Sequence, residues 1–171
     1  VGLPVIQARM PQRADNATYE SVFSSALARA NLRWPGVRDI AFGDLFLADI
    51  KAYRDALCAR HGWTPHYPLF GSDTTMLAHD MIDGGLRAQL CCVDTTQLDA
   101  RFAGNTFDNA LLDALPSDVD ACGEHGEFHT CVSDGPVFSP PIDNTRGATS
   151  LAARRFAYPA SPPPCNGAET P

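Results

Sequence analysis

The first sixty residues alternate between short apolar runs and segments with helical spacing of apolar side chains. Residues 3–8 (LPVIQA) form an apolar run that predicts a buried strand. Residues 18–31 place apolar side chains three and four positions apart, which predicts a helix with Asn16 as its N-cap. Residues 37–42 predict a second strand and residues 45–60 a second helix. This order of elements favours a parallel sheet with right-handed crossovers.

Shorter elements follow after a loop that is rich in proline and glycine. Ser72 or Asp73 can cap a helix that the glycine pair at residues 84 and 85 ends. Beyond residue 138 the chain is rich in Pro, Ser, Gly and Ala, which indicates a largely disordered tail over its last dozen residues. The expected elements are helices at residues 74–83 and 107–115, strands at 86–93 and 127–133, and one edge strand at 155–158.

Charge and cysteine usage narrow the classes of function. The formal net charge is −7 and no lysine or arginine cluster is present, which argues against a nucleic-acid partner. No apolar run approaches the roughly 20 residues of a membrane span, and the first residues do not resemble a signal peptide. The six cysteines include one in a predicted helix and two in a predicted buried strand. Reduced thiols are used in this way, so we expect a cytoplasmic protein without a membrane partner.

The segment Phe42-Gly43-Asp44 follows a predicted strand and precedes a predicted helix. Ligands of open α/β sheets collect at the carboxyl ends of strands. Gly43 would allow a ligand to approach the backbone, and Asp44 could orient a ribose, an amine or a metal-bound water. The alternative is that Asp44 only caps the helix that follows.

The densest group of polar side chains lies between residues 124 and 130. Glu124 and Glu127 are three positions apart, with His125 between them and His129 two positions after Glu127. If the chain turns at Gly126 and then extends, Glu127 and His129 share a face of a strand. A carboxylate beside an imidazole can bind an ammonium group or move protons. The alternative is a solvated loop that leads into an edge strand.

A metal site is a further hypothesis for the same segment. Cys122, His125, His129 and Cys131 have suitable donor atoms, in the spacing C-x₂-H-x₃-H-x-C. Zinc sites usually place their ligand pairs on separate structural pieces with a longer spacer. Four ligands within ten residues would not converge easily, so we expect no metal there.

Several blocks of the sequence together resemble the diphthine–ammonia ligase family of ATP pyrophosphatases. The most specific is CGEHGEFHTCVSDGPVF at residues 122–138, where the family pattern is Glu, Gly or Asn, Gly, Glu, aromatic, Glu or His, Thr. His125 departs from the usual Gly or Asn, which would narrow the pocket. The Gly-Glu-Phe-His-Thr form is more similar to the bacterial branch, whose acceptor carboxylate would not be diphthine. The further blocks are FGDLFLADIKAYRDAL, PLFGSDTTMLAHDMIDGGLRAQLCCVD and LDARFAGNTFD, and the resemblance covers roughly residues 5–138.

The resemblance implies an α/β fold, in which a partial, Rossmann-like sheet of the adenine nucleotide α-hydrolase type precedes a smaller α+β domain. It implies the remainder of the nucleotide-binding domain at residues 1–62 and a substrate-binding domain at 63–138. Residues 139–171 would form an edge strand and the tail. It also implies an ATP-dependent ligase that adenylates a carboxylate, releases pyrophosphate and lets ammonia displace AMP. The cofactor would be Mg-ATP, and the partners a small-molecule or protein carboxylate plus ammonia.

The residue roles follow from the same resemblance. Glu124, Glu127 and His129 would be catalytic, facing the reacting carboxylate or ammonia. Gly43 and Asp44 would line the nucleotide site, and Gly126, Phe128 and Thr130 would contact the substrate.

The family's glycine-rich phosphate loop, of the type Ser-Gly-Gly-Lys-Asp-Ser, has no counterpart in these residues. We therefore expect the C-terminal part of such a ligase, inactive alone, with an exposed strand edge that favours homo-oligomers. The alternative is a non-catalytic nucleotide- or ligand-binding relative.

Overall fold

The computed structural model describes residues 2–11, 14–142, 149–152 and 155–159 of the chain. They form a mixed α/β structure with a small parallel sheet and a separate antiparallel sheet. The chain divides into two compact units, an N-terminal unit (Gly2–Ser72) and a C-terminal unit that begins at Asp73. The family domain boundaries that we expect at residues 62 and 138 stay a prediction.

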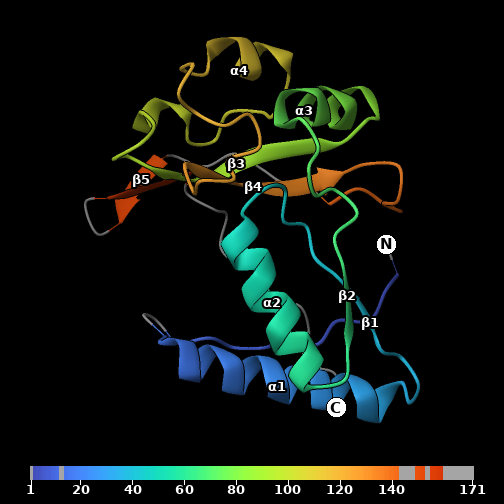
Figure 1. The fold of residues 1–171 in the computed structure, drawn as a ribbon. Helices are drawn as coiled ribbons and strands as arrows, with labels where there is room; N and C mark the ends of the chain where they lie inside the picture. The colour runs from blue at the N-terminus through green and yellow to red at the C-terminus, as the bar shows by residue number, and fades with distance from the viewer. Residues whose placement is uncertain (1, 12–13, 143–148, 153–154, 160–171) are drawn as a thin grey trace, which may run out of the picture. The chain divides into compact units, whose positions relative to one another are not determined.

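The N-terminal unit contains one parallel strand–helix–strand crossover. Helix α1 (Asn16–Arg33) precedes strand β1 (Asp39–Ala41), and helix α2 (Ala48–Arg60) connects β1 to strand β2 (Thr64–His66). The two strands pair in parallel from Asp39 opposite Thr64 to Ala41 opposite His66 (Figure 1). The crossover is the expected consequence of an apolar strand followed by an amphipathic helix.

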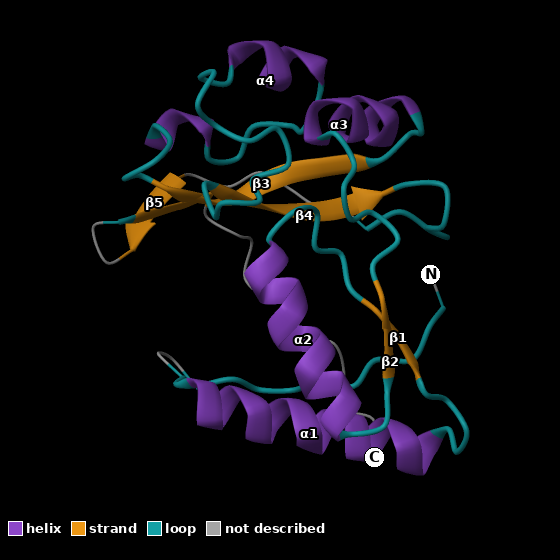
Figure 2. Cartoon of the chain, viewed as in Figure 1, coloured by secondary structure: helices purple, strands orange, loops and turns teal. Residues whose placement is uncertain are grey.

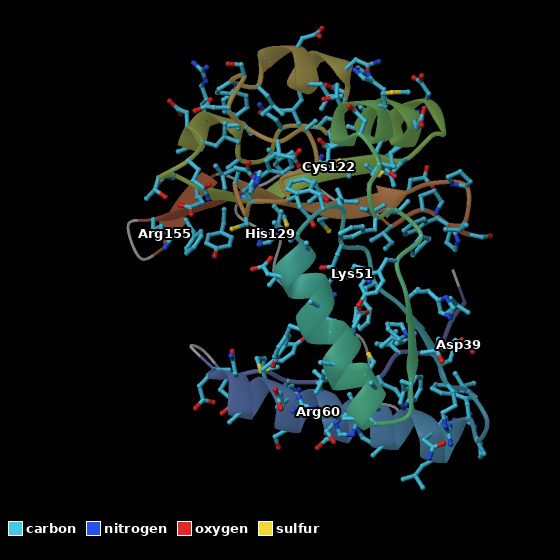
Figure 3. The ribbon with its side chains drawn as sticks, viewed as in Figure 1. Asp39, Lys51, Arg60, Cys122, His129 and Arg155 are labelled. Atoms are coloured by element: carbon cyan, nitrogen blue, oxygen red, sulfur yellow. The ribbon has the colours of Figure 1, made fainter. Side chains whose placement is uncertain are left out.

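The core of the N-terminal unit joins α1 to α2. Glu20 of α1 accepts a hydrogen bond from the hydroxyl of Tyr53 at 3.1 Å and forms an ion pair with Arg60 at 2.8 Å, both on α2 (Figure 3). The buried residues of this core are Leu27, Cys58 and Trp63, and Phe23, Ala30, Ile40 and Phe42 pack against them.

Two expectations for the start of the chain are wrong. Residues 3–8 form no strand in the structure, and Leu3 and Val5 are exposed. An apolar run becomes a strand only when a neighbouring strand pairs with it and a core covers it. Helix α1 begins two residues earlier than predicted, and its N-cap is Asp15, not Asn16: Oδ1 of Asp15 accepts a hydrogen bond from the backbone N–H of Thr18 at 2.8 Å.

The C-terminal unit is a four-stranded antiparallel sheet with its helices on one face (Figure 2). The strand order is β4-β3-β6-β5, so β3 is an inner strand that pairs with both β4 and β6. The elements are α3 (Thr74–Asp83), β3 (Arg87–Asp94), a short 3₁₀ helix η1 (Ala100–Phe102), α4 (Asn109–Ala114), β4 (Phe128–Asp134), β5 (Thr149–Ala152) and β6 (Phe156–Pro159).

Strand β3 carries the apolar side chains that the helices cover. Ala88, Leu90 and Val93 are at most 2% exposed. Phe128 of β4 and Ala157 of β6 join them, since Val93 pairs with both. The helical side of this core consists of Ala78, Met81 and Ile82 of α3, Phe102 of η1, and Leu111 and Leu112 of α4.

The predicted elements of this unit are mostly found. Helix α3 has the predicted bounds, because Asp73 caps it through Met76 N–H at 2.8 Å. Strand β6 matches the predicted strand at 155–158 but lies between β3 and β5, so the expectation of an edge strand is wrong. Strand β5, which no apolar pattern indicated, is the outer strand. The predicted disordered tail lies outside the described residues.

Two expectations bear on the compartment. The described cysteines, Cys58, Cys91, Cys92, Cys122 and Cys131, are free thiols, as predicted; Cys165 lies outside the described residues. None of the helices in the described part of the chain has the length and apolar character needed to span a bilayer.

The carboxylate of Asp94, the last residue of β3, is buried and hydrogen bonded. It is 2% exposed and receives hydrogen bonds from Nη2 of Arg155 at 2.6 Å and from the hydroxyl of Thr96 at 2.7 Å. The hydrogen bonds from Arg155, followed by those from Thr96, hold the pKa of Asp94 well below its usual range. The charge of Asp94 thus connects β3 to the residue that immediately precedes β6.

Replacing Leu90 with alanine is expected to lower the free energy of unfolding of the C-terminal unit by about 2–5 kcal/mol, because the side chain is fully buried. Hydrogen exchange of the β3 amides measures this unit selectively, whereas both tryptophans lie in the N-terminal unit. Met76→Ala is the matched control, since Met76 is 66% exposed and should change little. Equal exchange rates for Leu90→Ala and Met76→Ala would contradict the assignment of the core.

The ion pair of Asp94 predicts a dependence of stability on pH. Its folded-state pKa lies below the unfolded value of about 3.9, so its stabilisation is complete above that value and is lost as the pH falls. The stability difference between the wild type and Asp94→Asn should be largest at pH 7 and shrink below about pH 4. Urea titration at each pH, read out by hydrogen exchange of the β3 amides, measures this difference in stability. Asp113→Asn, an exposed change on α4, is the control; a pH-independent difference for Asp94→Asn would refute the prediction.

Candidate functional site

The loop at residues 120–127 is closed by two carboxylates. Oδ2 of Asp120 accepts hydrogen bonds from the backbone N–H groups of Cys122 and Glu124, both at 3.0 Å. The backbone N–H of Asp120 in turn donates to Oε1 of Glu127 at 3.0 Å. Asp120 therefore satisfies N–H groups inside the loop, and Glu127 satisfies the N–H of its first residue. This exchange fixes the loop without regular secondary structure.

Two glycines make the turn of this loop possible. Gly123 has φ +70° and Gly126 has φ +83°, a region that side chains with a Cβ atom rarely adopt. The N–H of Gly126 donates to the carbonyl of Gly123 at 3.0 Å. A Cβ atom at Gly123 would lie 2.8 Å from the carbonyl oxygen of Phe128, whereas one at Gly126 would meet no atom within 4 Å. The chain is thus closely packed at Gly123 and open at Gly126.

The two carboxylate oxygens of Glu127 have different surroundings. Oε1 accepts the hydrogen bond from Asp120 and lies 3.5 Å from Nδ1 of His125. Oε2 is buried and has no hydrogen-bond partner among the described residues. The Glu127 side chain is 3% exposed, whereas that of His125 is 57% exposed. An unpaired, buried carboxylate oxygen is costly, so Oε2 is the strongest indication of a ligand in this unit.

The remaining motif residues lie on β4. Phe128 is buried in the core under the helices. Because side chains alternate along a strand, His129 projects from the opposite face, where it is exposed (Figure 3). Thr130 is exposed and pairs with Leu90 of β3. The imidazole that lies beside the carboxylate of Glu127 is therefore that of His125, while His129 lies on the strand that follows.

The hypothesis of a metal site is not supported. Within the residues that the structure describes, no three His, Cys, Asp or Glu side chains are arranged to hold a metal ion. Sγ of Cys122 donates instead to the carbonyl of Thr74 at 3.3 Å. Burial, followed by the charges of Asp120 and Glu124, raises the pKa of Cys122 to about 11. Cys122 is thus a protonated thiol that packs the loop against α3.

Gly43 and Asp44 belong to the N-terminal unit and follow β1. A Cβ atom at Gly43 would meet no atom within 4 Å, so the backbone there is accessible. Asp44 does not cap a helix, because α2 begins only at Ala48. Its Oδ2 forms an ion pair with Nη1 of Arg54 at 2.8 Å, and the Arg54 guanidinium lies 4.6 Å from the ring centre of Phe42.

The two strands of the same unit border an open depression of about 570 Å³. Ligand sites of parallel sheets form at the carboxyl ends of the strands, and the end of β2 lies here, whereas β1 lines the depression along its whole length. The residues that line it are Asp39, Ile40, Ala41, His66, Tyr67 and Pro68.

The structure thus brings Glu124, His125 and Glu127 into one loop and adds Asp120, which sequence reasoning missed. An aspartate two residues before a Cys-Gly turn was the available signal, because aspartate accepts hydrogen bonds from the backbone N–H groups that follow it. Arg54, which pairs with Asp44 from ten residues away, gave no local signal.

The two loop glycines form a matched test of this packing. Gly126→Ala should lower the free energy of unfolding by about 1–2 kcal/mol, the cost of a left-handed backbone for a residue with a Cβ atom. Gly123→Ala should cost a further ~1–3 kcal/mol because the new atom overlaps Phe128. Hydrogen exchange of the β4 amides measures both. Equal losses for the two variants would show that Gly123 is not closely packed.

The comparisons with known proteins agree with this geometry. Residues 73–150 match the sequence model of a protein family described as the diphthamide synthase C-terminal domain. No curated protein matches the chain. The matched segment contains the whole loop at residues 120–127 and strands β3 and β4. The match over residues 73–150 therefore supports a diphthine–ammonia ligase-like family for this part of the chain.

Proposed function

We propose that this protein acts in an ATP-dependent amide-forming ligase of the diphthine–ammonia ligase type. A carboxylate oxygen attacks the α-phosphorus of ATP and releases pyrophosphate. The nitrogen of ammonia then attacks the acyl carbon, the bond to AMP breaks, and the nitrogen loses a proton. Such a reaction requires positioning and charge stabilisation more than a covalent nucleophile.

The observation that carries this proposal is the buried Oε2 atom of Glu127. The family match covers the motif, and within that motif one carboxylate oxygen lacks a donor from the described part of the chain. A substrate with N–H or O–H groups would supply that donor. Glu124 lies three residues away in the same loop and adds negative charge, which favours a cationic or proton-donating reactant.

The N-terminal unit offers a place for the nucleotide. Its parallel β1–α2–β2 crossover supports a sheet of the adenine nucleotide α-hydrolase type. Gly43 fits the role of a backbone contact, because the space above it is open. Asp44 fits less well as a direct ligand, because Arg54 neutralises its charge. We therefore assign the ribose or adenine contact to Gly43 and a supporting role to the Asp44–Arg54 pair, with Mg-ATP as the nucleotide.

The other assignments extend the same proposal. The acceptor is a carboxylate of a small molecule or a protein, and the free thiols fit a cytoplasmic enzyme. His129, on the exposed face of β4, and Thr130 are proposed to contact the acceptor rather than the nitrogen. Gly126 leaves space for it beside the loop, and Phe128 anchors the strand in the core.

Because these residues are expected to be inactive alone, the test uses the protein joined to a phosphate-loop region of the Ser-Gly-Gly-Lys-Asp-Ser type, with Mg-ATP, ¹⁵N-ammonium chloride and a carboxylate. A mixture of amino acids and dicarboxylic acids is one probe, and elongation factor 2 that carries diphthine is the other. The expected products are equal amounts of AMP, pyrophosphate and ¹⁵N-labelled amide, measured by mass spectrometry. Glu127→Gln should lower the rate about 100-fold or more, because it removes a charged group that faces the reactants.

Asp113→Asn is the control for loss of one acidic charge, since Asp113 is exposed on α4 and lies outside the loop. Its rate should equal that of the wild type. Binding of AMP or ATP without release of pyrophosphate would reject the ligase and support the non-catalytic nucleotide-binding alternative.

A further inference from the structure

The arrangement around Glu127 distinguishes the two roles that its carboxylate could have in a ligase. An ionised carboxylate offers about four lone-pair positions to donors. Those of Oε1 face the N–H of Asp120 at 3.0 Å and the imidazole of His125 at 3.5 Å. Oε2 points into the buried side, where the described residues supply no donor. The loop therefore fixes one oxygen and leaves the other for a ligand that donates hydrogen bonds.

The charge around the loop selects a cation. Asp120 and Glu124 are the other acidic residues of the loop, and Asp120 directs its Oδ2 at the backbone of Cys122 and Glu124. The charges of both carboxylates act on the thiol of Cys122, whose pKa they raise together with burial. A second anion, such as the reacting carboxylate, would be repelled at Oε2, whereas a small cation would be attracted.

The burial of Oε2 limits the size of that cation. Glu127 is 2% exposed, so a ligand at Oε2 must itself fit inside the loop. Ammonium is compact, carries four N–H donors and would satisfy an oxygen that otherwise costs free energy. The potassium ion carries the same charge as ammonium and has nearly the same radius, but it has no hydrogen to donate. It is therefore a suitable comparison.

His125 connects this buried carboxylate to the solvent. Its Nδ1 atom faces Oε1, and a carboxylate at that position favours the form of the ring in which Nδ1 carries the hydrogen. The ring is 57% exposed, whereas the carboxylate beside it is 3% exposed. An N–H directed at Oε1 limits the rotation of the carboxylate, which keeps Oε2 directed inward.

We propose that Oε2 of Glu127 is the ammonium site, and that His125 is the positioning residue that holds the Glu127 carboxylate with Oε2 directed at the nitrogen. The proposal rests on the ligase function for the fate of that nitrogen. One N–H bond of ammonium breaks, its electron pair stays on the nitrogen, and the proton moves to Oε2. The products of this step are neutral ammonia, which has the lone pair that attack requires, and a neutral Glu127 carboxyl group.

Carbon-13 NMR of the glutamate carboxyl groups tests the site directly. The chain has only four glutamates, Glu20, Glu124, Glu127 and Glu169, so selective ¹³Cδ labelling gives four assignable signals. The protein is titrated with ammonium chloride and, at equal ionic strength, with potassium chloride. We expect the Glu127 signal to shift and saturate with ammonium and to change at least about 10-fold less with potassium. Equal responses to the two salts, or no saturable shift, would overturn the ammonium site.

Two variants of His125 test the positioning role. His125→Ala should weaken the ammonium response of Glu127 about 10-fold. His125→Asn should restore most of it, since its side-chain amide can donate from nearly the position of Nδ1. Unchanged hydrogen exchange of the β3 amides in the C-terminal unit checks that each variant is folded. A wild-type response in His125→Ala, or no recovery in His125→Asn, would overturn the role of His125.

The outcome is separable from that of the ligase assay. A saturable ammonium shift without amide formation would reject the ligase and keep the ammonium site. Amide formation without that shift would keep the ligase and reject the site.

Discussion

The C-terminal unit depends on the way in which Asp94 ends strand β3. Its backbone N–H donates to the carbonyl of Glu127 at 2.9 Å, and its carboxylate receives Arg155 and Thr96. Asp94 thus connects β3, which carries the core, to Arg155 directly before β6 and to Glu127 directly before β4. A buried charge is costly unless it is paired and hydrogen bonded, and both conditions are met here. The position of the Glu127 backbone follows from this anchoring.

The loop at residues 120–127 uses the carboxylates at its two ends, those of Asp120 and Glu127, in different ways. Asp120 directs its Oδ2 at backbone N–H groups, which is a structural use of negative charge. Oε1 of Glu127 also accepts a hydrogen bond from a backbone N–H, but Oε2 accepts none from the described residues. A loop that is fixed at one oxygen can hold the other in a defined direction without a ligand. This is the property that a preorganised site requires, because no rearrangement is then needed when the reactant enters.

Local signals predicted the elements whose ends have local causes. Helix α3 was predicted to the residue, since Asp73 begins it and Gly84 and Gly85 follow its last residue. The core strand β3 and strand β4 were predicted within one residue at each end, because β3 is an apolar run and Gly135 follows Asp134 at the end of β4. The motif between residues 122 and 130 was also visible, and it indicated the same family as the sequence model that matches residues 73–150.

The misses share a different cause, because they depend on partners that are distant in sequence. Residues 3–8 are as apolar as a strand, yet no strand among the described residues pairs with them. Strand β5 has no apolar alternation and exists through its pairing with β6. Asp44 forms an ion pair with Arg54, ten residues later, and the backbone N–H of Asp120 donates to Glu127, seven residues later. Contacts of this kind follow from tertiary structure and leave no periodic signal.

The bulge in β3 has a consequence for the shape of the strand. Leu90 pairs with Thr130, but Cys92 already pairs with His129, so Cys91 is an extra residue. That residue allows Leu90 and Val93 to share the core although they are three positions apart. Without Cys91, the residues Leu90, Cys92 and Val93 would oppose Thr130, His129 and Phe128 in regular alternation, and Leu90 and Val93 would still share the core face. The extra residue therefore adds bend and twist to β3 shortly before Asp94, whose backbone N–H donates to the carbonyl of Glu127.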